Sequence, residues 1–366
     1  MKILILANDD IGLYQFRKEL IAELLKSNEV YISLPNGSFI EPLTMLGCQF
    51  VDTPVDRRGM NPLKDGKLFL SYRKLFKQVK PNLVITYTIK PNVYGGFAAR
   101  LVGIPYAVNI TGLGTAFQND GFLRKLVTRM YKLGCKKARV VFFENAENQQ
   151  IFIDEGIVQK ENTCLLNGAG VNLEHYRVLE YPADADTRFL YVGRVMKEKG
   201  IGELFTAMRR LVSEEVKCSL DMVGYFDDDF EEKIKEAENE GWLRYHGYQE
   251  DVRPFIENCH CFVLPSWHEG MANTNLECAA SGRPVITSNI HGCMEAVEDG
   301  VTGFLCEKQN ADSLYETMKR FCTLSIEERK TMGLSGRKRM EAVFDKRKVV
   351  EETIRHLSIC DEVPEG

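Results

Sequence analysis

The chain has 366 residues, of which 44% are hydrophobic and 27% are charged. This length suggests two domains of ~150 residues rather than one, and this composition excludes a mainly disordered chain or a coiled coil. No apolar run approaches the ~20 residues that cross a bilayer, because the first one, 3–7, is followed at once by Asn8, Asp9 and Asp10. We therefore expect neither a membrane-spanning helix nor a secretory signal.

The eleven cysteines are scattered singly between Cys48 and Cys360. An odd number does not fit a framework of disulfides, so we expect a reducing, cytoplasmic compartment. The tightest cluster is Cys259-His260-Cys261. We expect no metal there, because neighbours on a strand point to opposite faces and no second Cys/His pair has ligand spacing.

The net charge of -5 is divided unevenly along the chain: residues 1–170 sum to +7 and residues 171–366 to -12. A basic N-terminal half on an acidic protein indicates a local anionic partner, either a phosphate-bearing molecule or a membrane leaflet. Nucleic acid is not expected, since the molecule as a whole is acidic. An unevenly charged but merely solvated surface is the alternative.

The first half alternates short apolar runs with helical patterns, and several of these runs are apolar at consecutive positions, as in 83–85. Such runs are typical of parallel strands covered by helices on both faces. The expected strands, in chain order, are 2–7, 29–34, 49–52, 82–87, 106–110 and 140–144.

A polar, proline-containing segment follows, and the alternation then restarts with expected strands at 188–193, 219–223, 244–246, 261–264 and 285–287. The sequence therefore predicts an α/β protein with two doubly wound, Rossmann-like parallel sheets. The expected boundaries are an N-terminal domain at 1–172, a linker at 173–187, a C-terminal domain at 188–340, and a C-terminal helix with an acidic tail at 341–366 that crosses back to the N-terminal domain. We expect ligands at the carboxyl ends of the strands, in a cleft between the domains.

Two common nucleotide motifs are missing. The first strand is followed by 8–12 (Asn-Asp-Asp-Ile-Gly) and not by Gly-x-Gly-x-x-Gly, and there is no Walker phosphate loop. A dehydrogenase and a P-loop enzyme are therefore not expected. The Gly112-Leu113-Gly114 segment after a later strand is weak evidence for phosphate binding, since a tight turn would explain it equally well.

The second half carries charged groups at two strand ends. Gly193 and Arg194 end one strand and Lys199 opens the next helix, so both cations could meet an anion at a helix N-terminus. A pair of surface cations is the alternative reading. After a later strand, Glu269 lies in a loop and Glu277 lies in the following helix, where carboxylates could accept bonds from sugar hydroxyls.

These segments together resemble the retaining glycosyltransferases of the GT-B fold that carry a Glu-x(seven)-Glu motif, also called glycosyltransferase group 1 or family 4. The matching segments, in order, are Gly193-Arg194 with Lys199-Gly200, 262–266, Glu269-Gly270 with Glu277, 282–285 and 300–304. The resemblance covers nearly the whole chain. Five ordered matches are far more specific than any one of them.

The resemblance implies that Arg194 and Lys199 hold the diphosphate of a UDP-sugar donor, that Glu269 contacts the donor sugar and that Glu277 accepts the ribose hydroxyls. The resemblance also implies a frontside attack in which the leaving diphosphate takes the acceptor proton, and we therefore expect no metal or other cofactor to be needed. The acidic triplet 227–229 resembles a metal-binding motif, but we expect it to cap a surface helix. The other expected donor contacts are Gly193, Gly270, Met271, Ala272, Tyr248 within the nucleobase segment 246–252, Gly12, Asn109 and Thr111.

Many relatives have a donor-contacting histidine where this chain has Asn109-Ile110-Thr111. Neither Asn109 nor Thr111 can act as a base at neutral pH, although either can hydrogen-bond a hydroxyl. The loop that follows, with Thr-Gly-Leu-Gly at 111–114, is similar to that of enzymes that extend polyprenyl-diphosphate-linked sugars. This similarity implies a lipid-linked saccharide acceptor.

Residues 122–139 alternate apolar and basic side chains at helical spacing, as in a helix that lies on an anionic membrane surface. A helix packed on the sheet with a solvated basic face is the alternative. The segment 72–77 is a second basic patch. We expect Arg124, Lys125 and Arg129 to promote vesicle binding, and so a cytoplasmic protein at the inner face of the cell membrane.

The sequence thus predicts a retaining glycosyltransferase, a hexosyl- or N-acetylhexosaminyltransferase, in surface polysaccharide or glycoconjugate biosynthesis. Two alternatives share the scaffold. A sugar-nucleotide epimerase or hydrolase would need acid and base groups in the N-terminal half, which has no histidine before His175. A non-catalytic nucleotide-sugar-binding protein would bind donor without turnover.

Overall fold

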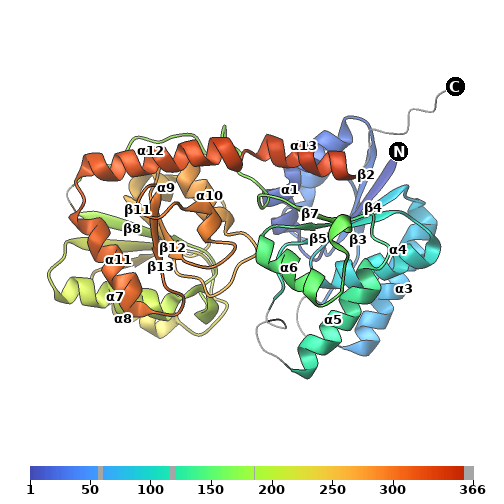
Figure 1. Ribbon diagram of the computed structural model, residues 1–366, viewed down its shortest axis with the longest axis horizontal. Helices are drawn as coiled ribbons and strands as arrows, with labels where there is room; N and C mark the ends of the chain where they lie inside the picture. The colour runs from blue at the N-terminus through green and yellow to red at the C-terminus, as the bar shows by residue number, and fades with distance from the viewer. Residues whose placement is uncertain (57–60, 115–116, 118–120, 185, 358–366) are drawn as a thin grey trace. The chain divides into compact units, whose positions relative to one another are not determined.

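The computed structural model describes residues 1–56, 61–114, 117, 121–184 and 186–357 (Figure 1). It consists of two compact units, one formed by Met1–Ala169 with Arg347–Gly366 and the other by Gly170–Lys346. The segment 173–187, expected as a linker, therefore groups with the second unit. Cys360 lies outside the described residues.

The first unit contains a seven-stranded sheet in the order β3-β2-β1-β4-β5-β6-β7, with all neighbours parallel. Alternate residues of β1 face opposite sides: Ile3 and Ile5 lie in one apolar core, and Leu4 and Leu6 lie in another. The sheet is therefore covered on both faces, as the apolar runs predict. The strands are β1 (Lys2–Leu6), β2 (Glu29–Leu34), β3 (Gln49–Asp52), β4 (Leu83–Tyr87), β5 (Tyr106–Ile110), β6 (Val140–Phe143) and β7 (Thr163–Leu165).

One face of this sheet is covered by α1, α2 and α13, and the other by α3, η1, α4, α5 and α6. The C-terminal helix α13 thus packs on a sheet formed by the start of the chain. The helices are α1 (Asp10–Leu25), α2 (Ile40–Met45), α3 (Pro62–Val79), η1 (Pro91–Gly95), α4 (Gly96–Val102), α5 (Phe122–Cys135), α6 (Ala146–Asp154), η3 (Lys160–Asn162) and α13 (Lys346–Leu357).

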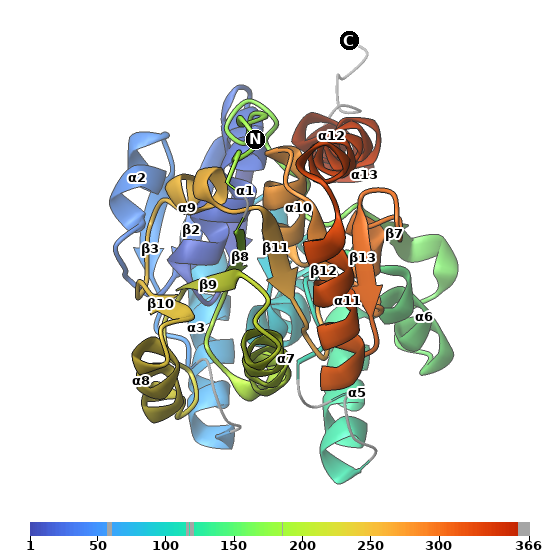
Figure 2. The same ribbon diagram turned by 90° about the vertical axis from the view of Figure 1, so that its left-hand side faces the viewer.

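The second unit contains a six-stranded parallel sheet in the order β10-β9-β8-β11-β12-β13. Two pairs of its helices pack against each other: α7 lies beside α11 in Figure 2, and α10 packs against α12. The strands are β8 (Thr187–Val192), β9 (Cys218–Val223), β10 (Leu243–Tyr245), β11 (Cys261–Leu264), β12 (Val285–Ser288) and β13 (Gly303–Cys306). The helices are η4 (Lys197–Lys199), α7 (Ile201–Ser213), α8 (Glu231–Asn239), α9 (Arg253–Asn258), α10 (Asn273–Ala280), η5 (Met294–Ala296), α11 (Ala311–Thr323) and α12 (Ile326–Val343).

The expected α/β fold with two doubly wound parallel sheets is confirmed. In both sheets the chain order reverses beside the first strand of the unit: β1 lies between β2 and β4, and β8 lies between β9 and β11. Open α/β sheets bind ligands at such a switch point, beyond the carboxyl ends of the strands. In the second unit this point brings together the segments after β8 and β11.

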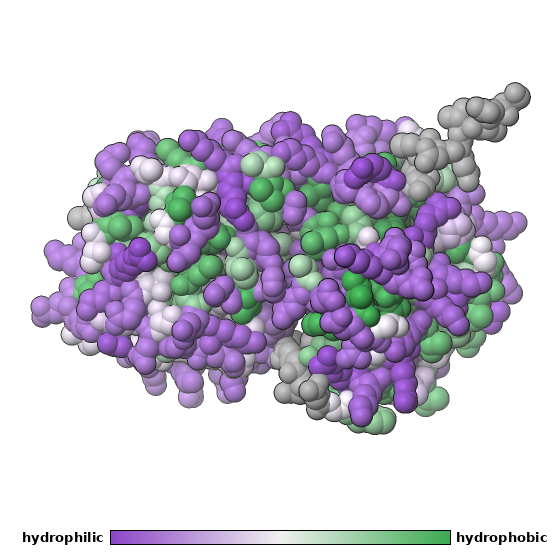
Figure 3. Space-filling view, in the orientation of Figure 1, coloured by the Kyte–Doolittle hydropathy of each residue, from purple (hydrophilic) through white to green (hydrophobic). Residues whose placement is uncertain are grey.

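Hydrophilic residues cover most of the molecular face in Figure 3, with smaller hydrophobic patches among them. Within the part of the chain that the structure describes, no helix combines the length and the apolar character needed to span a bilayer.

Candidate active site

The turn after β8 is fixed by a close contact between two glycines. A Cβ on Gly224 would lie 1.8 Å from the carbonyl oxygen of Gly193, and the Gly193 amide donates to Val223. Only a residue without a side chain at position 224 allows this approach. Gly224 therefore lets the segment after β9 pack against the turn that carries Gly193, an expected donor contact, and Arg194.

Lys199 ends the short helix η4, and the next residue has a left-handed backbone, with φ of +75° at Gly200. A Cβ on Gly200 would lie 2.1 Å from the carbonyl oxygen of Pro265, the residue after β11. The turn carrying Lys199 is thus pressed against the end of the neighbouring strand. This packing requires glycine and places the lysine beside the loop that contains Glu269.

Lys199 and Glu269 form an ion pair, and the Ser266 hydroxyl donates to the same carboxylate oxygen at 2.8 Å. The carboxylate side chain is only 12% exposed. Burial alone would raise its pKa, but the Lys199 ammonium and these hydrogen bonds outweigh burial and lower the pKa of Glu269. Glu269 is therefore an anion at neutral pH. Ser266 is fully buried. The sequence motif did not indicate that this residue would hold the Glu269 carboxylate.

Arg194 is 44% exposed, and its Nη1 donates to Asp227 at 2.7 Å. The next residue, Asp228, accepts from the backbone amide of Lys197 at 2.7 Å. The expectation that the acidic triplet caps a helix is wrong, because α8 begins at Glu231 without a side-chain cap. Instead, two of the aspartates hold the turn between Arg194 and Lys199, since the loops after β8 and β9 lie side by side.

The loop after Glu269 leads into α10, and Gly270, Met271 and Ala272 are buried. The Ala272 amide donates to the carbonyl of Gly292 at 2.7 Å. It is therefore occupied in this structure and does not add to an anion cradle. Gly292 itself has φ of +87°, and a Cβ there would lie 2.7 Å from the carbonyl oxygen of Glu269.

Glu277 lies in α10, as expected from its spacing, and its side chain is half-buried. Its carboxylate accepts a hydrogen bond from Tyr176, and burial followed by this carboxylate raises the pKa of the phenol. The segment that carries Tyr176 is held by Arg337 of α12, which donates to the carbonyls of Tyr176 and Ala280. Sequence reasoning missed Tyr176, because it lies in a segment that reads as a linker.

Tyr248 is 43% exposed and its ring lies 6.3 Å from that of Tyr225. The nearby His246 bonds Asp221 at 2.7 Å and contacts the ring of Phe255. The segment 246–252 therefore presents an exposed aromatic ring on a loop anchored by a histidine. An exposed pair of aromatic rings can stack on a planar base.

The three expected residues of the first unit have different surroundings. Gly12 lies in the first turn of α1, where its amide donates to Asp9 at 3.1 Å. The Asn109 side chain is buried in the sheet and donates to the Thr86 carbonyl at 3.2 Å. Asn109 therefore helps to hold the strand ends together. Thr111, directly after β5, is partly exposed.

The second unit thus brings Lys199 into contact with Glu269 and places Arg194 on the same turn as Lys199. Two cations in the segment after one strand can bind a diphosphate, and a carboxylate that follows the neighbouring strand and is paired with one of them can contact the group that the diphosphate carries. Glu277 supplies an acceptor for hydroxyls on the helix that follows. The arrangement can therefore bind a phosphorylated, polyhydroxylated molecule.

Two family models match the chain. Residues 180–339 match the model described as glycosyl transferases group 1, and residues 2–145 match the model described as glycosyl transferase 4-like. The two matches fall on the two parallel sheets, and together they span most of the chain.

Two curated relatives illustrate the similarity. The N,N'-diacetylbacillosaminyl-diphospho-undecaprenol alpha-1,3-N-acetylgalactosaminyltransferase of Campylobacter jejuni is 26% identical, with 99% of each chain covered. The UDP-Gal:alpha-D-GlcNAc-diphosphoundecaprenol alpha-1,3-galactosyltransferase of Escherichia coli is 28% identical over 72% of each chain.

Solved structures share the fold. Anabaena HepE in complex with UDP-glucose has a TM-score of 0.81 at 18% identity, with 98% of this chain and 99% of that chain covered. Sucrose-phosphate synthase from Thermosynechococcus elongatus has a TM-score of 0.77 at 18% identity, with 97% and 98% covered.

Proposed function

We propose that this chain, which belongs to the group 1 glycosyltransferases and has the GT-B fold, transfers a sugar from a UDP-sugar to a saccharide carried on a polyprenyl diphosphate. The proposal rests on one observation above all. Lys199 contacts Glu269 at the switch point of the second sheet, and Arg194 lies on the same turn.

In this proposal Arg194 and Lys199 bind the donor diphosphate. Charge-assisted bonds to a phosphate are stronger than neutral ones, and both cations have carboxylate partners that a diphosphate could replace or share. Glu269 contacts the donor sugar, Glu277 accepts the ribose hydroxyls, and Tyr248 lies against the base. The complex of HepE with UDP-glucose supports a donor of this class on a chain of the same fold.

Transfer with retention of the anomeric configuration is part of the proposal. The acceptor hydroxyl attacks the anomeric carbon on the side that the diphosphate leaves, and the leaving oxygen takes the hydroxyl proton. Arg194 and Lys199 stabilise the negative charge that grows on the diphosphate, which is the term that usually lowers such a barrier most. These cations would do this without a metal ion.

The acceptor class is supported by the relatives, two of which are named for undecaprenol-diphosphate-linked sugars. A peripheral position at the cytoplasmic face of the membrane would give access to such a lipid. The surface of α5 supports it: Phe122 is 80% exposed and Leu123 is 45% exposed, while Lys125, Arg129 and Lys132 are also exposed. Exposed apolar and basic side chains together are typical of interfacial helices.

The test is release of UDP from a panel of UDP-sugars, with and without a polyprenyl-diphosphate-linked saccharide. The proposal predicts release that depends on the acceptor, and a product whose new linkage keeps the configuration of the donor. Equal release without acceptor would indicate a hydrolase or epimerase instead. Donor binding without any turnover across acceptors would indicate a non-catalytic binding protein.

A further inference from the structure

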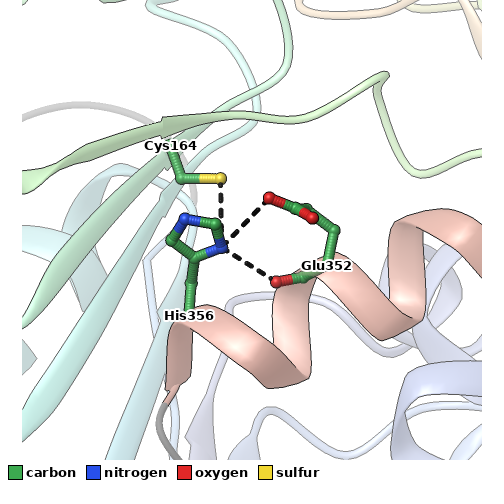
Figure 4. Close-up of side chains that lie close together, drawn as sticks. All are labelled: Cys164, Glu352 and His356. Atoms are coloured by element: carbon green, nitrogen blue, oxygen red, sulfur yellow. Dashed lines mark hydrogen bonds and ion pairs between the residues drawn. The ribbon is translucent and has the colours of Figure 1, made fainter.

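Three potential metal ligands converge where α13 crosses β7 in the first unit. They are the thiol of Cys164 on the strand and the side chains of Glu352 and His356 on the helix (Figure 4). The His356 Nδ1 lies 3.7 Å from the Cys164 sulfur and 3.2 Å from Glu352 Oε1. The three ligand atoms all lie within 4.8 Å of one another, the only such group of three among the described residues.

The two separations that involve His356 fit a tetrahedral ion. Bonds of ~2.3 Å to sulfur and ~2.0 Å to nitrogen and oxygen place a sulfur ligand ~3.5 Å from a nitrogen ligand and a nitrogen ligand ~3.3 Å from an oxygen ligand. The observed distances of 3.7 and 3.2 Å are close to both values. The third pair, the Cys164 sulfur and the Glu352 carboxylate, lies within 4.8 Å, and rotation of the Glu352 side chain toward the sulfur would bring it to the ~3.5 Å that a shared ion requires.

The elements hold the ligands in this geometry. Glu352 and His356 are four residues apart and so lie on the same face of α13. The imidazole meets the ring of Phe142 edge-on, with centroids 6.3 Å apart, and Phe142 pairs with Cys164 in the sheet. Apolar packing of α13, with Val349 and Leu357 buried, fixes the helix against the strand.

We propose that Cys164, Glu352 and His356 bind one zinc ion, with water in the fourth position. A thiolate, an imidazole and a carboxylate are the ligand types that zinc takes in proteins. On binding, the thiol releases its proton to solvent. The imidazole coordinates through Nδ1 with its proton on Nε2, and Nδ1 gives up its present bond to the Glu352 carbonyl, which measures 3.0 Å.

Such an ion ties the C-terminal helix to the edge strand of the N-terminal sheet. Cys164 and His356 are 192 positions apart in the sequence, so an ion that binds both would close a long loop of the chain. The role is structural or regulatory and is separate from sugar transfer, since the ligands lie on the face of the sheet and not among the donor-binding residues of the second unit. The inference does not depend on the proposed function.

The test uses tag-free protein, stripped with a chelator and titrated with Co²⁺ and Zn²⁺. We expect one Co²⁺ per chain, with a near-ultraviolet thiolate-to-cobalt charge-transfer band that Zn²⁺ abolishes. Affinity should fall as the pH is lowered, because binding releases protons. Zn²⁺ in excess should raise the thermal midpoint by about 5 °C, since it binds the folded state.

Two variants test the position of the ion, and a third serves as the control. Cys164→Ser should remove the charge-transfer band, and Glu352→Gln, at a partly exposed position, should weaken Co²⁺ binding at least tenfold. His291→Gln is the matched control, because His291 pairs with Glu295 four residues away but belongs to no such group of three. The inference is overturned if wild-type protein shows neither the band nor stabilisation, or if the band persists in Cys164→Ser.

Discussion

Among single residues, Lys199 has the largest expected role in sugar transfer. It pairs with Glu269 in a site where both side chains are mostly buried, so its ammonium is already positioned before a ligand arrives. Preorganised charge of this kind stabilises a transition state without rearrangement during the reaction. Arg194 is more exposed, and we expect its contribution to be smaller and more sensitive to salt.

Replacing Lys199 by alanine should therefore lower kcat/KM for sugar transfer by a factor of about 10²–10³. Lys197→Ala is a matched control, since Lys197 is an exposed lysine of the same turn whose ammonium lies over the Trp267 ring. It should change kcat/KM less than about fivefold. Initial rates of UDP release measure both. Equal losses in the two variants would contradict the role assigned to Lys199.

At the scale of elements, the loop that carries Glu269 is held by backbone packing against Gly292. A Cβ at Gly292 would lie 2.7 Å from the Glu269 carbonyl and 2.8 Å from that of Gly270. We expect Gly292→Ala to displace this loop and reduce transfer at least tenfold, although it removes no functional group.

Gly300→Ala is the control for that variant. Gly300 also has a left-handed φ, +75°, but nothing lies within 4 Å of its Cβ position. The Gly300→Ala variant should therefore lose only about 1 kcal/mol of unfolding free energy, from the left-handed backbone. Sugar transfer by the folded protein should be retained. Comparable loss of activity in both variants would show that the backbone conformation, and not the contact, is responsible.

A second element-level contact joins the segment before β8 to the start of β11. His260 is fully buried; its Nδ1 accepts from the Arg188 amide at 3.1 Å, and Nε2 bonds the Asp184 carbonyl at 3.2 Å. Burial, followed by the Arg188 charge, lowers the pKa of His260 to about 4. The folded protein therefore keeps this imidazole neutral at a pH where the unfolded chain protonates it.

This difference makes stability depend on pH. Above the unfolded pKa of about 6.5 the histidine contributes no pH dependence, and as the pH falls from there to about 4 it should cost up to about 3 kcal/mol of unfolding free energy. Gln at 260 can make the same two bonds without titrating. Denaturation at pH 7 and pH 4.5 should show a smaller decrease for His260→Gln than for wild type. An equal decrease would contradict the assignment.

Several elements could be predicted from sequence because apolar runs mark buried central strands. The expected strands do not include β7 and β13, which lie at the edges of their sheets, but they do include the other two edge strands, β3 and β10. Edge position alone therefore does not explain the difference. β13 begins with Gly303, a residue that usually argues against a strand. Glycine is needed there, since a Cβ would lie 2.0 Å from the Val285 carbonyl.

Side-chain partners could not be predicted in the same way. The motif indicated that Lys199 and Glu269 lie near one ligand, but not that they contact each other or that Ser266 bonds the carboxylate. Asp227 reads as part of a helix cap, and only the pairing of β8 with β9 brings it to Arg194. Such contacts join distant segments, so local sequence patterns do not encode them.

For the molecule as a whole, the uneven distribution of charge predicts that the basic first unit, and not the acidic second unit, contacts an anionic membrane. Arg124 was expected to contribute, but it pairs with Glu155 at 2.9 Å, so its replacement would also disturb the first unit. Lys125→Glu with Arg129→Glu changes only exposed positions of α5. Binding to vesicles with anionic lipid should fall about tenfold or more, at ~1 kcal/mol for each basic residue.

The matched control reverses two exposed lysines of the acidic second unit, Lys233 and Lys235 in α8. It makes the same change in net charge, and vesicle sedimentation should not respond to it. Equal losses for the two double variants would mean that net charge alone governs binding. Unchanged sedimentation of the α5 variant would contradict a membrane role for this helix.

Arg194, Lys199, Glu269 and Glu277 are expected to gather around one donor molecule. The most direct measurement is a crystal structure of the protein with a UDP-sugar. The account predicts that the diphosphate lies within hydrogen-bond distance of Arg194 and Lys199, that the ribose hydroxyls bond Glu277 and that the sugar contacts Glu269. A donor bound elsewhere, with these four side chains not touching it, would contradict the account.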